Sequence, residues 1–154
     1  MKINMTQVES MDPWTFSFGA LMVVATKLDT QLDNALKKFD LTSKQWFLLM
    51  ILQNTFEAPP TLKQLASEMG SSYQNVKQVA LKLESKGFIR IEKDTNDARA
   101  LRLVLTDELK GLWDKMGPDA AQFMRGFYQE ITENDIIVFK RTLNQLLMNL
   151  LSQE

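Results

Sequence analysis

The sequence predicts a mainly helical α+β fold, and three observations support this prediction. Apolar residues recur at helical spacing through most of the 154 residues. Residues that commonly cap helices, such as serine and threonine, precede several of these segments. After Gly87 the apolar spacing changes from a helical period toward alternation, which indicates a pair of strands. We therefore expect a series of helices interrupted by one β-hairpin.

The first two helices are predicted from periodicity and start signals. Residues 14–38 carry apolar side chains at helical spacing, and the Asp-Pro pair at 12–13 is a natural start because proline is tolerated in the first turn. The second helix begins near Thr42, which has Gln45 at the spacing of a capping box. The Ala-Pro-Pro run at 58–60 is a rigid break after it.

Two short helices follow in close succession. The first covers residues 61–69, and a single glycine separates it from the second, 71–86. Ser71 and Gln74 have capping-box spacing at the start of the second helix, and Gly87 ends it as a left-handed cap. Two capped helices joined across one glycine are typical of a helix-turn-helix.

The predicted hairpin comes directly after this helix pair. Residues 88–92 and 100–105 read as antiparallel strands, with three leucines on one face of the second strand. The segment 93–99 between them is polar and rich in turn-forming residues, so we expect a wing with its tip near 95–98. The fold class is therefore a winged helix-turn-helix with flanking helices.

A further helix is predicted after the hairpin. Thr106 is expected to cap it, and the acidic residues at 107–108 suit the positive end of the helix dipole. Gly117 and Pro118 are expected to kink or break this helix before it resumes as far as Tyr128.

The terminal helices predict dimerisation. The last helix, 133–151, carries an apolar stripe too wide to leave exposed on a monomer, and 14–38 also carries an apolar face. The alternative is that both faces pack only within one chain. We expect residues 1–40 and 107–154 to form a helical dimerisation lobe, and residues 41–106 to form the winged lobe.

Composition excludes several functions. The chain contains no cysteine and no histidine, so it cannot form a disulfide, a thiol redox sensor, a zinc site built on thiolate or imidazole, or a Ser-His-Asp triad. We expect no enzymatic activity, no metal and no cofactor. No apolar stretch is long enough to span a bilayer and no secretory signal is evident, so we expect a cytoplasmic protein without a membrane partner.

Charge is distributed unevenly along the chain. Residues 61–106 carry eight basic and five acidic side chains, a local charge of +3, so the rest of the chain sums to −4 within a total of −1. Phosphate attraction depends on the local field, so the low total charge is compatible with binding to double-stranded DNA.

One face of the 71–86 helix predicts contact with DNA. If Val76 points inward, Val79, Ala80 and Leu83 fall within roughly 60° of it at about 100° per residue. The opposite face carries amide, hydroxyl and ammonium groups that can bind base edges and phosphates, although a solvated surface helix would also carry them. The candidate DNA-contacting residues of this helix are Ser71, Ser72, Gln74, Asn75, Lys77, Gln78 and Lys82.

The wing contributes the remaining candidates, Lys93, Asp97 and Arg99. A guanidinium near the tip of a narrow hairpin suits a minor groove, whose negative potential deepens where it narrows. Asp97 is expected to brace Arg99 or the turn. The alternative is an ordinary exposed pair that contributes under about 1 kcal/mol.

The winged segment resembles the MarR family of bacterial transcriptional regulators. The residues that carry the resemblance are Leu65-Ala66, Asn75-Val76, Val79, Leu83-Glu84, Gly87-Phe88-Ile89, Asp97, Arg99 and Leu103-x-Leu105-Thr106. The resemblance implies a homodimer of winged-helix subunits whose recognition helices enter successive major grooves of a pseudo-palindromic operator. It further implies a repressor, with Asp97 and Arg99 as the wing pair.

Many members of the family bind small aromatic or lipophilic effectors between the two lobes. Here the candidate pocket residues are Phe16, Phe18, Trp46, Met50 and Trp113. Aromatic residues at helical spacing are also the usual material of a core. Since the chain lacks cysteine and histidine, it cannot resemble the peroxide-sensing or zinc-sensing members. The alternative function is a winged-helix protein-interaction or antirepressor module with no DNA partner.

Overall fold

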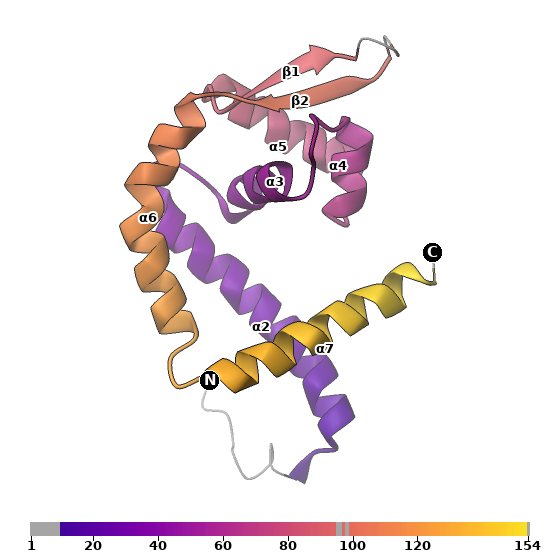
Figure 1. Cartoon of the computed structure of the whole chain (residues 1–154), viewed down its shortest axis with the longest axis vertical. Coiled ribbons are helices and arrows are strands. Elements are labelled where there is room, and N and C mark those ends of the chain that lie inside the picture. The colour runs from indigo at the N-terminus through magenta and orange to yellow at the C-terminus, as the bar shows by residue number, and fades with distance from the viewer. Residues whose placement is uncertain (1–9, 95–96, 98, 154) are drawn as a thin grey trace. The chain divides into compact units, whose positions relative to one another are not determined.

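The computed structural model describes residues 10–94, 97 and 99–153 and confirms a mainly helical fold with one two-stranded antiparallel sheet (Figure 1). The elements are α2 (Pro13–Leu36), the 3-10 helix η1 (Lys37–Phe39), α3 (Ser43–Asn54), α4 (Leu62–Glu68), α5 (Tyr73–Ser85), β1 (Ile89–Lys93), β2 (Leu101–Leu105), α6 (Glu108–Phe127) and α7 (Glu133–Leu151). The chain divides into two compact units, 1–116 and 117–154, and α6 passes from one to the other. The expected division into a dimerisation lobe and a winged lobe stays a prediction.

Reciprocal capping boxes start three of the helices. At α3 the Gln45 N–H donates to Thr42 Oγ1 at 3.2 Å, and Gln45 Oε1 accepts from the Thr42 N–H at 3.1 Å. The same reciprocal pairs start α4 and α7. Each box satisfies backbone donors that have no partner inside the helix. The predicted start of α3 is therefore confirmed.

Gly87 is confirmed as a left-handed cap, and Gly70 adopts the same conformation. Gly70 has φ +57° and Gly87 has φ +79°, a region that residues with a Cβ rarely adopt. After α4 the Ser71 N–H donates to the Ala66 carbonyl at 3.0 Å, which completes a Schellman motif. Ser71 therefore belongs to the end of α4. Contrary to the sequence prediction, Ser72 caps α5, where its Oγ accepts from the Asn75 N–H at 3.2 Å.

The start of α6 also differs from the prediction. The Thr106 hydroxyl does not cap this helix but donates to the Gly87 carbonyl at 2.5 Å, and the Thr106 N–H donates to the Phe88 carbonyl at 3.1 Å. Thr106 thus joins the end of β2 to the turn that follows α5. The hydroxyl bonds to the Gly87 carbonyl instead of an N–H of α6 because the fold brings this carbonyl, 19 residues earlier in the chain, next to it.

The expected break at Gly117 and Pro118 is absent, and α6 continues through Pro118 to Phe127. A proline inside a helix leaves the carbonyl four residues earlier, here that of Asp114, without its helical donor. Both residues are exposed, so water can satisfy that carbonyl. An exposed helix therefore tolerates the proline without ending.

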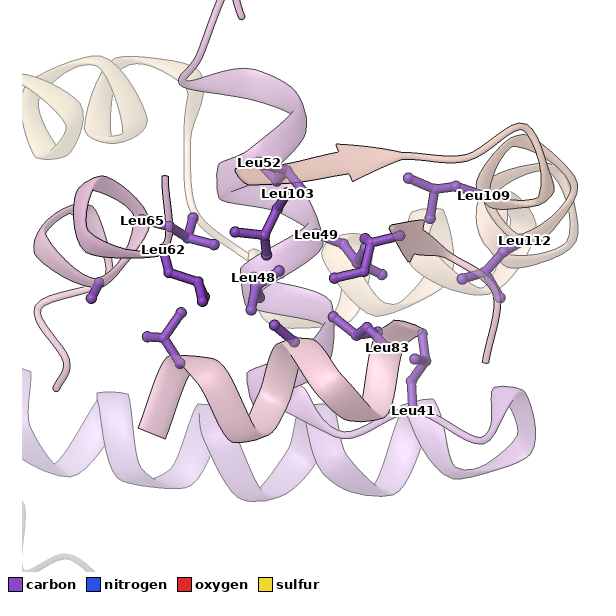
Figure 2. Packing of buried hydrophobic residues seen from close by; sticks show 14 of the residues in the cluster. Leu41, Leu48, Leu49, Leu52, Leu62, Leu65, Leu83, Leu103, Leu109 and Leu112 are labelled. Atoms are coloured by element: carbon purple, nitrogen blue, oxygen red, sulfur yellow. The ribbon is translucent and has the colours of Figure 1, made fainter. Parts of the chain in front are cut away.

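A leucine-rich core holds the first unit together (Figure 2). Leu48 and Leu49 of α3, Leu83 of α5 and Leu103 of β2 are fully buried and point into one shared interior. Leu109 of α6 extends the same cluster. The core thus connects the helix-turn-helix to the base of the hairpin.

The hairpin has a regular register. Ile89 pairs with Leu105, Ile91 with Leu103, and Lys93 with Leu101. The inward residues of both strands pack against the core, as the alternation predicts.

The second unit leaves apolar surface exposed. No residue of α7 is buried, and the exposed apolar residues of this helix are Ile137, Val138, Phe139, Leu146, Leu147, Met148, Leu150 and Leu151. Phe127, Tyr128 and Phe139 help to line an apolar cavity of about 300 Å³ between the end of α6 and the start of α7. An exposed apolar face made of this many side chains of α7 is typical of an interaction surface.

Leu81 and Leu83 allow a matched test of the core. Leu83→Ala should lower the free energy of unfolding by about 2–5 kcal/mol, because it leaves a cavity in a close-packed interior. Leu81→Ala on the same helix should change it by about 0.5 kcal/mol or less, because Leu81 is 42% exposed. Urea denaturation followed by circular dichroism measures both changes, and equal losses would contradict the placement of α5.

Candidate DNA interface

Helix α5 presents one buried and one exposed face. Val76, Ala80 and Leu83 are buried, as their spacing predicts. The exposed predicted residues of this region are Ser71, Ser72, Gln74, Asn75, Gln78 and Lys82, and Lys77 is half-buried. The structure thus brings the predicted helix candidates together on and beside one outward face.

The C-terminal end of α5 is attached to the turn that follows α2. Lys86 Nζ lies 2.9 Å from Asp40 Oδ2 and also donates to the Asp40 carbonyl. Asp40 has φ +54°, so its backbone turns sharply after η1. No local sequence signal indicates this pair, because its members lie 46 residues apart.

Two aspartates of α2 reach the start of α3 near α5. The Ser43 N–H donates to Asp33 at 2.6 Å, and Ser43 Oγ donates to Asp29 at 2.5 Å. Gln78 and Lys82 of α5 line the same cavity of about 300 Å³. The carboxylates therefore fasten the start of α3 to α2, and α5 borders the same cavity.

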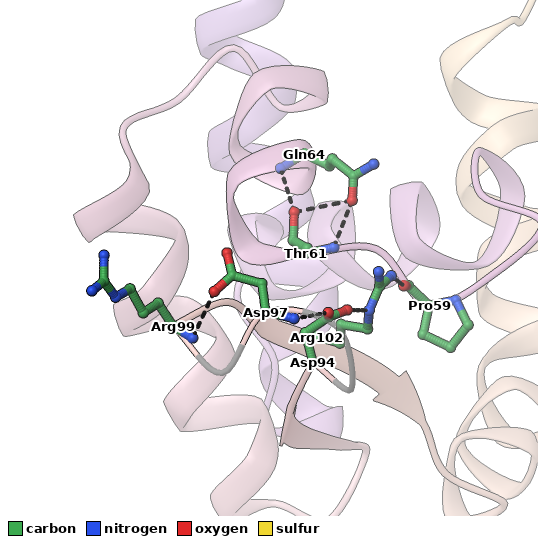
Figure 3. A network of polar contacts seen from close by, with 7 residues as sticks. All are labelled: Pro59, Thr61, Gln64, Asp94, Asp97, Arg99 and Arg102. Carbon is green, nitrogen blue, oxygen red and sulfur yellow. Dashed lines mark hydrogen bonds and ion pairs between the residues drawn. The ribbon is translucent and has the colours of Figure 1, made fainter.

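Backbone hydrogen bonds order the described part of the wing. The Asp97 N–H donates to Asp94 Oδ1 at 2.7 Å, and the Arg99 N–H donates to Asp97 Oδ1 at 2.9 Å. Asp97 thus braces the turn through the backbone of Arg99. The Arg99 side chain points away from this network and is exposed (Figure 3), as is Lys93 at the end of β1. Of the predicted tip, residues 95, 96 and 98 lie outside the described residues.

Arg102 forms a junction that the sequence did not indicate. Its Nε pairs with Asp94 Oδ2, and its Nη1 donates to the Pro59 carbonyl at 2.5 Å (Figure 3). Alternation on β2 places Arg102 on the face opposite to the inward leucines, and this periodicity does not indicate a partner for its side chain.

Glu84 attaches the hairpin to α5. Its Oε1 accepts a hydrogen bond from the Ile91 N–H at 2.7 Å. This N–H has no partner in the β1–β2 ladder, so the carboxylate satisfies it while fixing β1 against the end of the helix.

The predicted pocket residues occupy different environments. Phe16 and Phe18 of α2 are exposed, whereas Trp46 and Trp113 are half-buried against the core. Trp113 Nε1 donates to Gln53 Oε1 at 2.7 Å. Met50 is half-buried. The effector pocket stays a prediction.

The described residues, 10–94, 97 and 99–153, contain no cluster of three or more acidic side chains arranged to hold a metal ion. None of their helices combines the length and the apolarity needed to cross a membrane.

The arrangement defines the class of protein. Helices α4 and α5 meet at the Gly70 turn, an antiparallel hairpin follows, and the second helix exposes a polar face. This is a winged helix-turn-helix. Residues 41–101 match the model of the MarR family, which confirms the resemblance of this segment.

Solved structures extend the likeness beyond this segment. The transcriptional regulator PA3341 is 26% identical with a TM-score of 0.73, over 88% of this chain and 98% of that one. AbsC, a MarR family regulator from Streptomyces coelicolor, is 22% identical with a TM-score of 0.76, over 92% and 97%. A MarR regulator from Methanosarcina mazei Go1 is 17% identical with a TM-score of 0.78, over 91% and 99%.

No curated protein sequence matches the chain. The family model and the structures of regulators together support a DNA-binding regulator. The flanking helices share the fold of these regulators, because the likeness covers nearly the whole chain.

The bond between Glu84 and Ile91 can be tested with two substitutions. Glu84→Ala should lower the free energy of unfolding by about 1–3 kcal/mol, because it leaves the Ile91 N–H without its acceptor. Glu84→Gln keeps an acceptor oxygen and should lose less. Hydrogen exchange at the Ile91 amide should accelerate in the alanine variant, and unchanged protection there would contradict the role of Glu84.

Proposed function

We propose that the protein is a sequence-specific, double-stranded DNA-binding transcriptional regulator that acts as a homodimer and represses its target. The observation that carries the proposal is the exposed face of α5, which gathers amide and ammonium side chains on a helix whose opposite face is locked into the core. A rigid helix with this chemistry can enter a major groove with its contacts already positioned.

On this proposal the helix provides both base and phosphate contacts. Gln74 and Gln78 are exposed and can each form a bidentate pair with adenine. Lys77 and Lys82 can reach guanine or the backbone. Ser72 caps α5 and Ser71 directly precedes it, next to the helix start where the backbone N–H groups and the helix dipole favour a phosphate.

The wing adds a second contact. The Arg99 side chain is exposed and points away from the hydrogen-bond network of the turn, which supports its insertion into the adjacent minor groove (Figure 3). Asp97 fixes the backbone at Arg99, and Lys93 can add a phosphate contact.

Exposed apolar helix faces support a homodimer. The α7 helix has no buried residue, and Trp14, Phe18 and Met22 are exposed on α2. A second copy would remove such surfaces from water and provide a second recognition helix. Two such helices bind half-sites about 34–36 Å apart, one turn of the duplex. In this proposal residues 1–40 and 107–154 form the dimerisation lobe and residues 41–106 the DNA-binding lobe.

Leu81 supports a second candidate function. It is exposed on the reading face, where an apolar side chain can contact a thymine methyl or a protein partner. A winged-helix protein-interaction module would use the latter contact.

Two alanine variants test the DNA contacts. Gln78→Ala should reduce discrimination at one base position by about 1–3 kcal/mol, because it removes one bidentate contact. Arg99→Ala should weaken binding across sequences or at A·T-rich flanks. An operator selected from random duplexes, followed by fluorescence anisotropy, measures both effects.

Gln129→Ala, an exposed change outside the winged segment, is the control and should bind like wild type. A wild-type protein that never prefers a selected duplex over a scrambled one would overturn the proposal and favour the protein-interaction module.

A charge placed on the apolar face of α7 tests the dimer. Leu150 is 64% exposed, and Leu150→Glu should convert dimers to monomers because an interface would have to bury an unpaired carboxylate. Gln145→Glu adds the same charge about 140° away, at about 100° per residue, and should leave the dimer intact. Light scattering after size-exclusion chromatography measures the mass, and a monomeric wild type would contradict the homodimer.

A further inference from the structure

We propose that Arg102 is a positioning residue for DNA binding, which holds the wing in register with the helix-turn-helix so that Arg99 and α5 engage one duplex together. The inference rests on the proposed DNA-binding function. It concerns a residue that makes no part of the proposed DNA contacts.

The Arg102 guanidinium connects two segments that are remote in sequence. Its Nε pairs with Asp94 at the start of the wing turn, and its Nη1 donates to the Pro59 carbonyl at 2.5 Å. Pro59 lies 43 residues earlier, in the connection that leads into α4. One side chain therefore links the wing to the entrance of the helix-turn-helix (Figure 3).

The backbone beside Arg102 follows the same path. The Leu103 N–H donates to the Pro60 carbonyl at 3.0 Å, and Thr61 forms an isolated β-bridge with Arg102. Thr61 is the residue that caps α4. The second strand of the wing is thus fastened to the first helix of the helix-turn-helix by both backbone and side chain.

A continuous series of hydrogen bonds leads from this junction to Arg99. Arg102 pairs with Asp94, Asp94 Oδ1 accepts from the Asp97 N–H at 2.7 Å, and Asp97 Oδ1 accepts from the Arg99 N–H at 2.9 Å. The Arg99 side chain then extends away from the network (Figure 3). A shift at Arg102 would therefore move the backbone that carries the minor-groove contact.

Burial and charge favour positioning over a direct phosphate contact. The Asp94 side chain is only 4% exposed, and a buried carboxylate needs a paired cation. Arg102 provides that cation, so its charge is balanced inside the protein. Arginine suits this role better than lysine because its planar fork places two donors on two different acceptors at once.

The test uses Arg102→Lys, which keeps the positive charge but lacks the planar guanidinium that reaches both acceptors. It should weaken binding to the selected operator by about ten-fold or more, the equilibrium equivalent of one lost charge-assisted hydrogen bond. The slope of log affinity against log salt should stay as in wild type, because no phosphate contact is removed. Arg99→Ala supplies the reference for a lost wing contact.

A double-mutant cycle shows whether Arg102 acts through Arg99. If it does, Arg99→Ala should cost far less affinity in the Arg102→Lys background than in wild type. A merely structural role would lower stability equally in both backgrounds and leave the two losses in affinity additive. Arg90→Lys on β1 is the matched control and should bind like wild type, since Arg90 pairs only with Glu92 among the described contacts.

Asp94→Asn is the second variant, from the other side of the pair, and keeps the inference testable if Arg102→Lys does not fold. It should weaken binding to the operator as Arg102→Lys does, and it should likewise reduce the affinity that Arg99→Ala costs. Wild-type affinity in either folded variant, or additive losses, would overturn the positioning role. If the slope of log affinity against log salt falls by about one in an Arg102→Met variant, Arg102 contacts a phosphate instead.

These outcomes are distinct from a failure of the proposed function. If wild type binds no duplex specifically, the DNA-binding proposal fails. If wild type binds and Arg102→Lys binds equally well, only the inference about Arg102 fails.

Discussion

The burial of one face of α5 in the leucine core is the constraint on which the rest of the structure depends. Val76, Ala80 and Leu83 occupy that interior, so the helix cannot rotate about its axis without exposing them. Such a rotation is costly in a close-packed interior, because each cavity that it leaves lowers the free energy of unfolding. The polar side chains on the exposed face of α5 therefore keep a fixed orientation relative to the core. A surface of flexible glutamine and lysine side chains is thereby carried on a rigid element.

The wing depends on the same core and on polar attachments. An isolated two-stranded hairpin is marginally stable in water, so this one needs support from outside its own ladder. Leu103 supplies it from the inward face. Glu84, Arg102 and Thr106 supply it through hydrogen bonds to segments on either side. These attachments differ in kind from the core, because hydrogen bonds specify direction where apolar contacts do not.

The second unit has the opposite character. Its helix α7 buries nothing, and its apolar side chains remain on the surface. Exposed apolar area of this extent is unfavourable for a protein that stays monomeric. The winged segment is stable through contacts within the chain, whereas α2 and α7 leave apolar side chains exposed. This difference is the physical basis for proposing that the two parts have different tasks.

Most elements and the outward face of α5 were predictable from the sequence, because their signals are local. Capping boxes, left-handed glycines and apolar periodicity are each determined within a few residues. The predicted helix caps were wrong where the residue with capping spacing forms a hydrogen bond elsewhere instead. Ser71 completes the end of α4 and so leaves the cap of α5 to Ser72. Thr106 donates to Gly87 and does not cap α6.

The sequence by itself determined the winged helix-turn-helix, its polar face and the apolar terminal helices, since periodicity and caps encode each of these locally. Only the tertiary structure decided what holds the parts in register. Lys86 meets Asp40 across 46 residues, and Arg102 meets Pro59 across 43. Such pairs have no periodicity and no fixed spacing, because the folded core, rather than the neighbouring residues, brings their atoms together.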